Sequence, residues 1–177
     1  MNMLEAKKII VIGCPGSGKS TFARKLRDLA GLPLYYLDMI YHRPDRSTVS
    51  REGFDAALAD ILAKDEWIID GNYLRTLPVR LAACEMVFFF DLPLEQCLEG
   101  AASRVGTVRE DLPWTETELD PEFRQYILDF PKDQLPRMRL LLKDLCVAGR
   151  SGAPSLITFT DRGQADAFVR AICTGRN

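Results

Sequence analysis

The stretch "VIGCPGSGKST" at residues 11–21 decides the fold of this chain. Its segment 13–20 satisfies the pattern G-x-x-x-x-G-K-[ST], between the apolar run 9–12 and a helical pattern that starts near Lys19. Glycines tolerate positive φ and carry no Cβ, so successive backbone N–H groups can turn inward around an anion at a helix N-terminus. The stretch therefore predicts a phosphate-binding loop between a strand and a helix.

Individual members of this loop have distinct chemical roles. Lys19 is expected to reach the β- and γ-phosphates of a nucleoside triphosphate, and the Ser20 hydroxyl is expected to ligate Mg²⁺. Pro15 has no N–H, so the amides of residues 16–21 are expected to capture the anion, with Thr21 extending the row of donors. The residues expected to bind ATP are Gly13, Pro15, Gly16, Ser17, Gly18, Lys19, Ser20 and Thr21.

Short β-rich runs alternate with longer helical patterns along the chain, which predicts an α/β fold with a parallel sheet. The expected strands are 9–12, 34–37, 67–69, 86–90 and 155–160. Helices are expected from Lys19 to about Gly31, over 54–62, and at the end of the chain. Ser47 and Ser50 are candidate caps of the second helix. A further helical pattern of roughly 60 residues precedes the last strand, broken at Pro113, Pro121, Pro131 and Pro136.

Length and composition narrow the classes of protein. With 177 residues, of which 47% are hydrophobic, the chain is expected to form one domain over residues 1–177. The formal net charge of -2 provides no global positive field, so nucleic acid is not an expected partner. Five scattered cysteines and one histidine predict no zinc site and suit the cytoplasm. No apolar run approaches the ~20 residues of a membrane span, so no membrane association is expected.

Other phosphate-loop classes fit this chain poorly. No N-K-x-D motif, which would specify guanine, follows the fourth or fifth expected strand. The chain is also too short for the additional modules of a motor or transporter ATPase. A small kinase-like protein therefore fits best.

The chain resembles adenylate-kinase-related phosphate-loop proteins, and within them the FlaR-like group, often labelled DNA topology modulation proteins. Besides the loop, the segments that carry this resemblance are "YYLDMIYHRPD" (35–45), "WIIDGNYLRT" (67–76), "FFFDLPLEQCL" (88–98), "FPKDQLPRM" (130–138) and "ITFTDRGQADAF" (157–168). The resemblance implies a three-layer α/β/α fold whose five parallel strands have the order 2-3-1-4-5. It also implies a helical lid at about residues 95–135.

Two acidic residues compete for a place beside the metal. The implied strand order puts Asp70 at the end of the strand beside the phosphate loop, where a carboxylate can hold Mg²⁺ directly or through water. Asp91 also follows an apolar strand, but we favour a helix cap before Leu94 for it. Asp70 is therefore the expected metal residue, together with Ser20.

The acceptor side is expected near the second strand and the segment "DGNY". Asp38 could orient or deprotonate an acceptor hydroxyl, or serve as a cap or turn residue. Asn72, Tyr73 and Arg75 are also expected to bind the substrate, although Tyr73 could instead pack in the core. Arg75 is similar in position to the adenylate kinase arginine that contacts the phosphates of the bound nucleotides, and its alternative is a surface helix residue. The Thr-Gly-x-x-x-Arg element with which adenylate kinases hold AMP has no counterpart here, so AMP is not the expected acceptor.

Arginines are expected to neutralise charge during phosphoryl transfer. Arg104 and Arg109 in the lid are the candidates, with solvated surface side chains as the alternative. Arg162 could stack on an adenine ring or lie in the first turn of the closing helix.

Two functions follow from these patterns. The leading one is an ATP- and Mg²⁺-dependent phosphotransferase acting on an unidentified small-molecule acceptor, with a nucleoside or nucleotide among the candidates. The alternative is a nucleotide-binding regulatory switch or weak ATPase linked to DNA topology or gene regulation.

Overall fold

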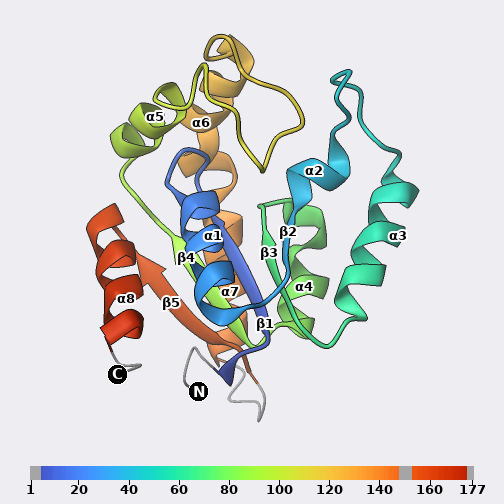
Figure 1. The fold of residues 1–177 in the computed structure, drawn as a ribbon, viewed down its shortest axis with the longest axis vertical. Helices are drawn as coiled ribbons and strands as arrows, with labels where there is room; N and C mark the ends of the chain where they lie inside the picture. The colour runs from blue at the N-terminus through green and yellow to red at the C-terminus, as the bar shows by residue number, and fades with distance from the viewer. Residues whose placement is uncertain (1–4, 148–152, 175–177) are drawn as a thin grey trace.

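The computed structural model describes residues 5–147 and 153–174, which form a parallel sheet with helices on both faces (Figure 1). The strand order is β2-β3-β1-β4-β5. The strands are β1 (Lys8–Gly13), β2 (Leu34–Tyr36), β3 (Trp67–Asp70), β4 (Met86–Phe90) and β5 (Ser155–Phe159). The α/β/α class and the strand order expected from the resemblance are thereby confirmed.

The helices lie in two layers and in a separate group above the sheet. They are α1 (Lys19–Ala30), α2 (Leu37–Tyr41), α3 (Arg51–Leu62), the 3-10 helix η2 (Leu74–Thr76), α4 (Leu77–Ala83), α5 (Leu94–Ala102), α6 (Pro121–Asp133), α7 (Leu135–Val147) and α8 (Arg162–Thr174). Figure 1 shows α1 and α8 on one face of the sheet and α4 and α7 on the other. The helices α5 and α6, joined by the irregular segment 103–120, lie beyond the end of β1 that carries the phosphate loop.

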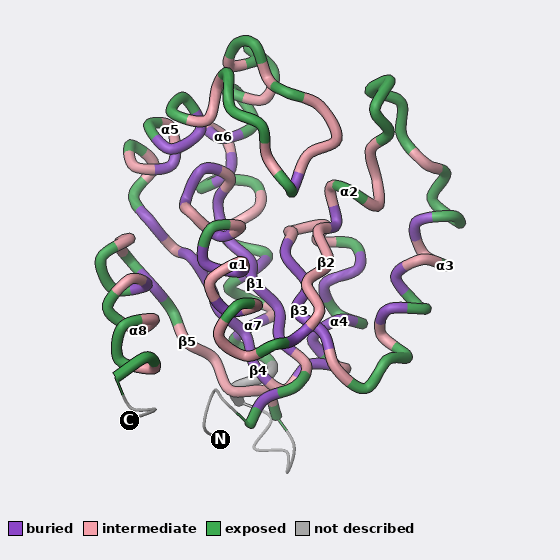
Figure 2. The backbone as a smooth tube through the Cα atoms, in the orientation of Figure 1, coloured by how far each residue is buried: buried purple, intermediate pink, exposed green. Residues whose placement is uncertain are grey.

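The central strand β1 places the loop in the middle of the sheet edge. Residues 9–12 are fully buried, because β1 pairs with β3 on one side and β4 on the other and both of its faces are covered (Figure 2). Its register sets Val11 beside Asp70 and Gly13 beside Phe90. The ends of β3 and β4 therefore flank the loop directly.

Some local expectations need correction. The second strand ends at Tyr36 and α2 begins at Leu37, so Asp38 lies in the first turn of a short helix. The Asp38 carbonyl accepts the His42 N–H at 2.9 Å, which closes that turn. Neither α2 nor α4 was expected from the hydrophobic pattern.

The proposed caps and helix breaks also differ in part from the structure. Ser50 is the N-cap of α3 and accepts the Gly53 N–H at 3.0 Å, whereas the Ser47 hydroxyl donates to Asp45 at 2.6 Å in the preceding loop. Pro131 does not break a helix, because it lies within the last turn of α6. None of the described helices has the length and apolarity needed to cross a bilayer.

Candidate functional site

The loop between β1 and α1 has the backbone expected of an anion cradle. Gly18, the N-cap of α1, has a φ of 102°, a left-handed conformation that favours glycine, and no side chain caps this helix end among the described residues. The first-turn amides of Lys19, Ser20 and Thr21 therefore point beyond the helix without intrahelical partners. The Ser17 N–H is used within the loop, because it donates to the Cys14 carbonyl at 3.3 Å.

The Lys19 side chain lies inside the loop rather than in solvent. It is buried, and its ammonium group donates to the Cys14 carbonyl at 2.9 Å. This hydrogen bond holds the ammonium group beside the first-turn amides. Both kinds of donor that a polyphosphate requires, backbone amides and a point charge, are therefore concentrated at one place.

Helix α5 is pressed against the loop from the lid side. A Cβ on Gly16 would lie 2.0 Å from the Cys97 carbonyl oxygen, and a Cβ on Gly100 would lie 2.0 Å from the Gly16 carbonyl oxygen. Such distances exclude any side chain at either position. The two glycines therefore allow the backbones of α5 and the loop to touch.

Asp70 is the buried carboxylate next to the loop. It is 5% exposed, and its Oδ1 has no hydrogen-bond partner among the described residues. Burial raises the pKa of Asp70 to about 6, against the opposing effects of the Lys19 charge and a hydrogen bond with the Ser20 hydroxyl. The competing residue Asp91, which follows β4, is bound by Arg139 at 2.7 Å, and Pro93 rather than Asp91 is the N-cap of α5, so the expectation of a cap was wrong.

The oxygen donors of Asp70 and Ser20 fit a hard divalent cation. The described residues contain no cluster of three or more His, Cys, Asp or Glu side chains that could hold a metal by themselves. Mg²⁺ does not require such a cluster in phosphoryl-transfer sites, because it retains waters and takes oxygen ligands from the phosphates. An unpartnered buried carboxylate oxygen beside a hydroxyl is therefore the donor set expected here.

A cavity of about 540 Å³ opens on the lid side of the loop. Residues 16–21 line it, together with residues from α5, α8 and the segment 103–111. Arg162, the first residue of α8, lines this cavity and donates to the carbonyls of Gly16 and Gln96. Its guanidinium group therefore ties α8 to the loop and to α5.

A second cavity, of about 840 Å³, opens on the side of β2 and β3. Five residues expected at the acceptor or the metal line it: Ser20, Asp38, Asp70, Asn72 and Tyr73. The two cavities share five lining residues, which are Lys19, Ser20, Arg104, Arg109 and Asp111. The Lys19 ammonium group and the Ser20 hydroxyl group thus lie where the two cavities meet.

The acceptor-side residues have different surroundings. The Tyr73 hydroxyl donates to the Asp38 carboxylate at 2.8 Å, and burial, followed by the Asp38 charge, raises the pKa of Tyr73. The Asn72 side-chain oxygen accepts the Gly13 N–H at 3.0 Å, so Asn72 supports the start of the phosphate loop. Arg75 lines neither cavity and forms a bidentate pair with Asp55 of α3, at 2.6 and 2.9 Å.

Arg80, which was not predicted from the sequence, holds the segment 71–73 in place. Arg80 of α4 is fully buried, and its guanidinium group donates to the carbonyls of Gly71, Asn72 and Tyr73. Burial lowers the pKa of Arg80 to about 10. The one signal in the sequence is a single arginine within the apolar run "LPVRLAA", which the helical pattern places in the core.

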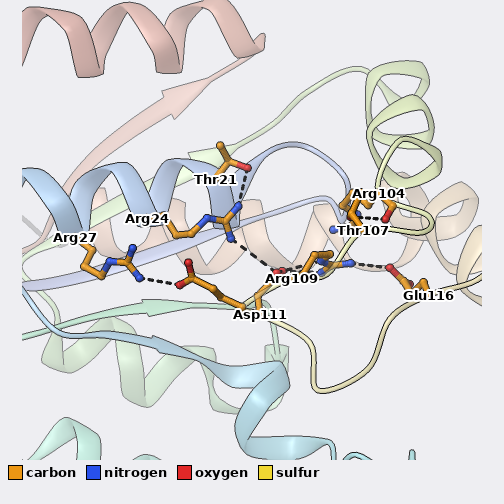
Figure 3. Close-up of polar contacts among 9 residues, drawn as sticks. Thr21, Arg24, Arg27, Arg104, Thr107, Arg109, Asp111 and Glu116 are labelled. Carbon is orange, nitrogen blue, oxygen red and sulfur yellow. Dashed lines mark hydrogen bonds and ion pairs between the residues drawn. The ribbon is translucent and has the colours of Figure 1, made fainter.

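Lid residues approach the loop through a set of ion pairs (Figure 3). Arg109 binds Asp111 at 2.6 Å and Glu116 at 2.6 Å. Arg24 of α1 lies 3.9 Å from Asp111, and Arg27 binds Glu110 at 2.8 Å (Figure 3). The segment 109–111 is thereby held against α1, next to the loop.

Asp111 is the second residue that sequence reasoning missed. It is buried, and although burial raises the pKa of its carboxyl group, the hydrogen bond and charge of Arg109 lower that pKa further, so the net shift is downward. A hydrogen bond with the Ser20 hydroxyl acts in the same direction. Nothing in the local sequence distinguishes Asp111 from the neighbouring Glu110.

Arg104 and Arg109 both reach the junction of the cavities but differ in their partners. Arg109 is occupied by two carboxylates, whereas the Nε of Arg104 is buried with no partner among the described residues. Burial, followed by the nearby charge of Arg109, lowers the pKa of Arg104. Arg104 is therefore the lid arginine with donor capacity left for a ligand.

Comparison with known proteins identifies the fold. No family model matches the chain, and no curated protein matches it by sequence. Among solved structures, the chain is similar to shikimate kinase from Acinetobacter baumannii in complex with shikimate, with 17% identity and a TM-score of 0.61 over 97% of this chain and 93% of that one. It is also similar to a gluconokinase from Sinorhizobium meliloti 1021, with 16% identity and a TM-score of 0.51 over 96% of this chain and 90% of that one. The chain therefore has the fold of phosphate-loop kinases.

Proposed function

We propose that this protein is an ATP- and Mg²⁺-dependent phosphotransferase that acts on a small molecule. The observation that carries this proposal is the meeting of two cavities at Lys19 and Ser20. A protein that only binds or hydrolyses a nucleotide needs the first cavity alone. The second cavity, which faces the same ammonium group, provides room for a phosphoryl acceptor.

On the donor side, the amides of the first turn of α1 and the Lys19 ammonium group would bind the β- and γ-phosphates of ATP. Asp70 and Ser20 would hold Mg²⁺, which neutralises charge on the phosphate oxygens when it is bound. Arg162 would contact the nucleotide from the wall of the cavity.

On the acceptor side, Asp38 would receive the proton of the acceptor hydroxyl as its oxygen attacks the γ-phosphorus. The new bond joins that oxygen to phosphorus, and the bond to the β–γ bridging oxygen breaks, so that ADP leaves. Tyr73 would orient the Asp38 carboxylate through its hydrogen bond. Phosphoryl transfer depends mainly on such positioning and on charge stabilisation.

The lid would supply the remaining positive charge. We assign the contact with the transferred phosphoryl group to Arg104 because its Nε is unpartnered among the described residues. Arg109 would act by holding the segment 103–120 against the junction. In this proposal residues 1–177 form one domain with a lid at about 95–135, although the ends of that domain, 1–4 and 175–177, lie outside the described residues.

The resemblance of the five segments supports membership of the FlaR-like group, and the scattered cysteines support a cytoplasmic location. The second cavity, with a volume of about 840 Å³, has the size of a small-molecule site and favours a metabolite over DNA as the second ligand. A gel-shift titration at low salt tests this choice: DNA binding that saturates and strengthens with ATP would favour the regulatory alternative.

The direct test measures ADP release from Mg·ATP across a panel of small hydroxyl compounds. At least one compound should raise the rate well above the acceptor-free rate, and Lys19→Ala should lower the stimulated rate about 100-fold or more. Lys64→Ala, which changes an exposed lysine outside both cavities, is the matched control and should leave the rate unchanged. A panel on which no compound stimulates turnover would contradict the proposal.

A further inference from the structure

The two cavities carry opposite charge. The cavity on the lid side of the loop is lined by six Lys or Arg and three Asp or Glu residues. The cavity on the side of β2 and β3, called the acceptor cavity below, is lined by four Lys or Arg and seven Asp or Glu residues. Both cavities open onto Lys19, so the difference in charge comes from the lining residues away from this shared lysine. It therefore bears on which ligand each cavity binds.

The difference in charge between the two cavities is larger when the five shared residues are left out. The lining that belongs to the acceptor cavity alone then contains Arg46 as its one Lys or Arg, against six carboxylates, one of which, Glu116, is paired with the shared Arg109. These are Asp38, Asp70, Glu116, Glu118, Asp120 and Glu122. Asp70 is the most buried of them and has an unpartnered oxygen, whereas Glu118 and Glu122 are exposed at the mouth.

Of the four cations that line the acceptor cavity, Arg109 is paired with carboxylates, and Arg46 alone is not shared with the other cavity. Arg109 is bound by Asp111 and Glu116, and the Arg46 guanidinium lies 5.8 Å from the centroid of the Trp114 ring. Lys19 and Arg104 are shared with the cavity for the polyphosphate. An acceptor with its own carboxylate or phosphate would therefore meet a lining with more carboxylates than cations, in which Arg46 is the one cation that belongs to this cavity alone.

The remaining lining consists of aromatic side chains and neutral polar groups. Tyr36, His42, Tyr73, Trp114, Phe123 and Tyr126 line the cavity. The Tyr36 hydroxyl and the His42 Nδ1 are buried with no partner among the described residues. Ring faces bind planar or cationic groups, and neutral donors and acceptors bind hydroxyls.

Resting on the phosphotransferase proposed above, we infer that the acceptor is an uncharged or cationic hydroxyl compound with a ring, the class to which nucleosides and amino sugars belong. Phosphorylated and carboxylated acceptors are disfavoured by the same charges. Asp38 binds the reacting hydroxyl, the aromatic side chains bind the ring, and the carboxylates at the mouth favour a positive ligand.

The test is calorimetry with matched pairs of compounds that differ in one anionic group. The pairs are adenosine with AMP, cytidine with CMP, and glucosamine with glucosamine 6-phosphate, each titrated with and without Mg²⁺ and a non-hydrolysable ATP analogue. Shikimate provides a carboxylate. In at least one pair the neutral or cationic member should bind tenfold or more tightly than its anionic partner. Tighter binding of the anionic members, or the absence of any preference, overturns the inference.

A charge variant separates this inference from the proposed function. The double variant Glu118→Gln/Glu122→Gln should reduce, severalfold, the difference in affinity between the two members of the preferred pair. Its affinity for the ATP analogue should stay the same. The control Asp60→Asn/Asp65→Asn removes two exposed charges outside both cavities. It should change neither the affinity difference within the pair nor the affinity for the ATP analogue. Failure of the wild type to bind the ATP analogue would refute the phosphotransferase, but the titrations without analogue would still decide which charge the acceptor cavity prefers. A preference that the Glu118/Glu122 variant leaves unchanged would count against the inference.

Discussion

The Tyr73 hydroxyl donates a 2.8 Å hydrogen bond to the Asp38 carboxylate, which joins the segment after β3 to the first turn of α2. Tyr73 has a φ of 35°, an uncommon value for a residue other than glycine, and the guanidinium group of Arg80 holds its carbonyl. The Asp38 carboxylate, which lines the second cavity, is therefore positioned by a residue that is itself fixed by the core.

We expect Tyr73→Phe to lower kcat about tenfold, because the substitution removes a hydrogen bond to a charged group, of the order of 1.5–3 kcal/mol, without emptying the site. The affinity for an ATP analogue should stay the same. Steady-state kinetics and calorimetry measure the two effects. Tyr35→Phe, which changes a tyrosine that lines neither cavity, is the control. An equal loss of ATP affinity would show that Tyr73 acts on the fold rather than on Asp38.

Gly100→Ala should separate helix α5 from the phosphate loop. The added Cβ would lie 2.0 Å from the Gly16 carbonyl oxygen and 2.2 Å from the Arg162 guanidinium group, and the carbonyl cannot move without distorting the loop. We expect a loss of about 1–3 kcal/mol in the free energy of unfolding and a loss of about tenfold in ATP-analogue affinity. Urea unfolding and calorimetry measure both.

Gly53→Ala is the matched control for that substitution. It adds the same methyl group in α3, where the nearest contact is the Ser50 side-chain oxygen at 3.3 Å. Its stability and affinity should stay close to those of the wild type. If Gly100→Ala behaved in the same way, the close approach of the two backbones would not be a constraint.

Asp70→Asn should make the metal-free protein more stable at neutral pH. The pKa of Asp70 in the folded protein, about 6, exceeds its ordinary value of 3.8, so the folded state holds a proton between these values that the unfolded state has lost. The contribution of this group to stability is therefore greatest below pH 4 and decreases as the pH rises to 6, by roughly 3 kcal/mol at most. Asparagine avoids this cost.

Urea unfolding in EDTA from pH 4 to pH 8 checks this expectation. The variant and the wild type should be similar near pH 4, and the variant should be more stable above pH 6. With Mg·ATP present, the order should reverse, because the variant loses the carboxylate proposed for the metal. A stability difference that does not vary with pH would show that Asp70 is not a buried carboxylate of raised pKa.

Arg104→Gln should affect catalysis, whereas Arg109→Gln should affect the structure of the lid. Arg104 has an unpartnered Nε at the junction, so its loss should lower kcat by about 100-fold with little change in ATP-analogue affinity. Arg109→Gln should instead release the segment 103–120, since Asp111 and Glu116 lose their shared partner. Limited proteolysis of this segment should accelerate severalfold for Arg109→Gln alone.

A rescue experiment tests the second assignment. Adding Asp111→Asn to Arg109→Gln removes a buried carboxylate whose remaining cationic neighbour, Arg24, lies 3.9 Å away, so the double variant should be more stable than Arg109→Gln. If the double variant is less stable than either single variant, the pair does not act as a unit.

Some features could be predicted from the sequence because their causes are local. The phosphate loop depends on glycines, a lysine and a hydroxyl at contiguous positions, and the apolar run 9–12 depends on burial of a central strand on both faces. The strand 86–90 was confirmed at its exact limits for the same reason. The order of the strands came from the resemblance to a family, and the structure confirmed it.

What the sequence by itself determined is a phosphate-binding loop on an α/β scaffold, since backbone conformation and hydrophobic periodicity are properties of short segments. The tertiary structure alone decided that Asp111 and Arg104 reach the loop, that Arg80 holds the segment "GNY", and that the two cavities differ in charge. Ion pairs such as Arg27 with Glu110 join positions 83 residues apart. Their formation depends on how the lid docks, and no local pattern of residues encodes that geometry.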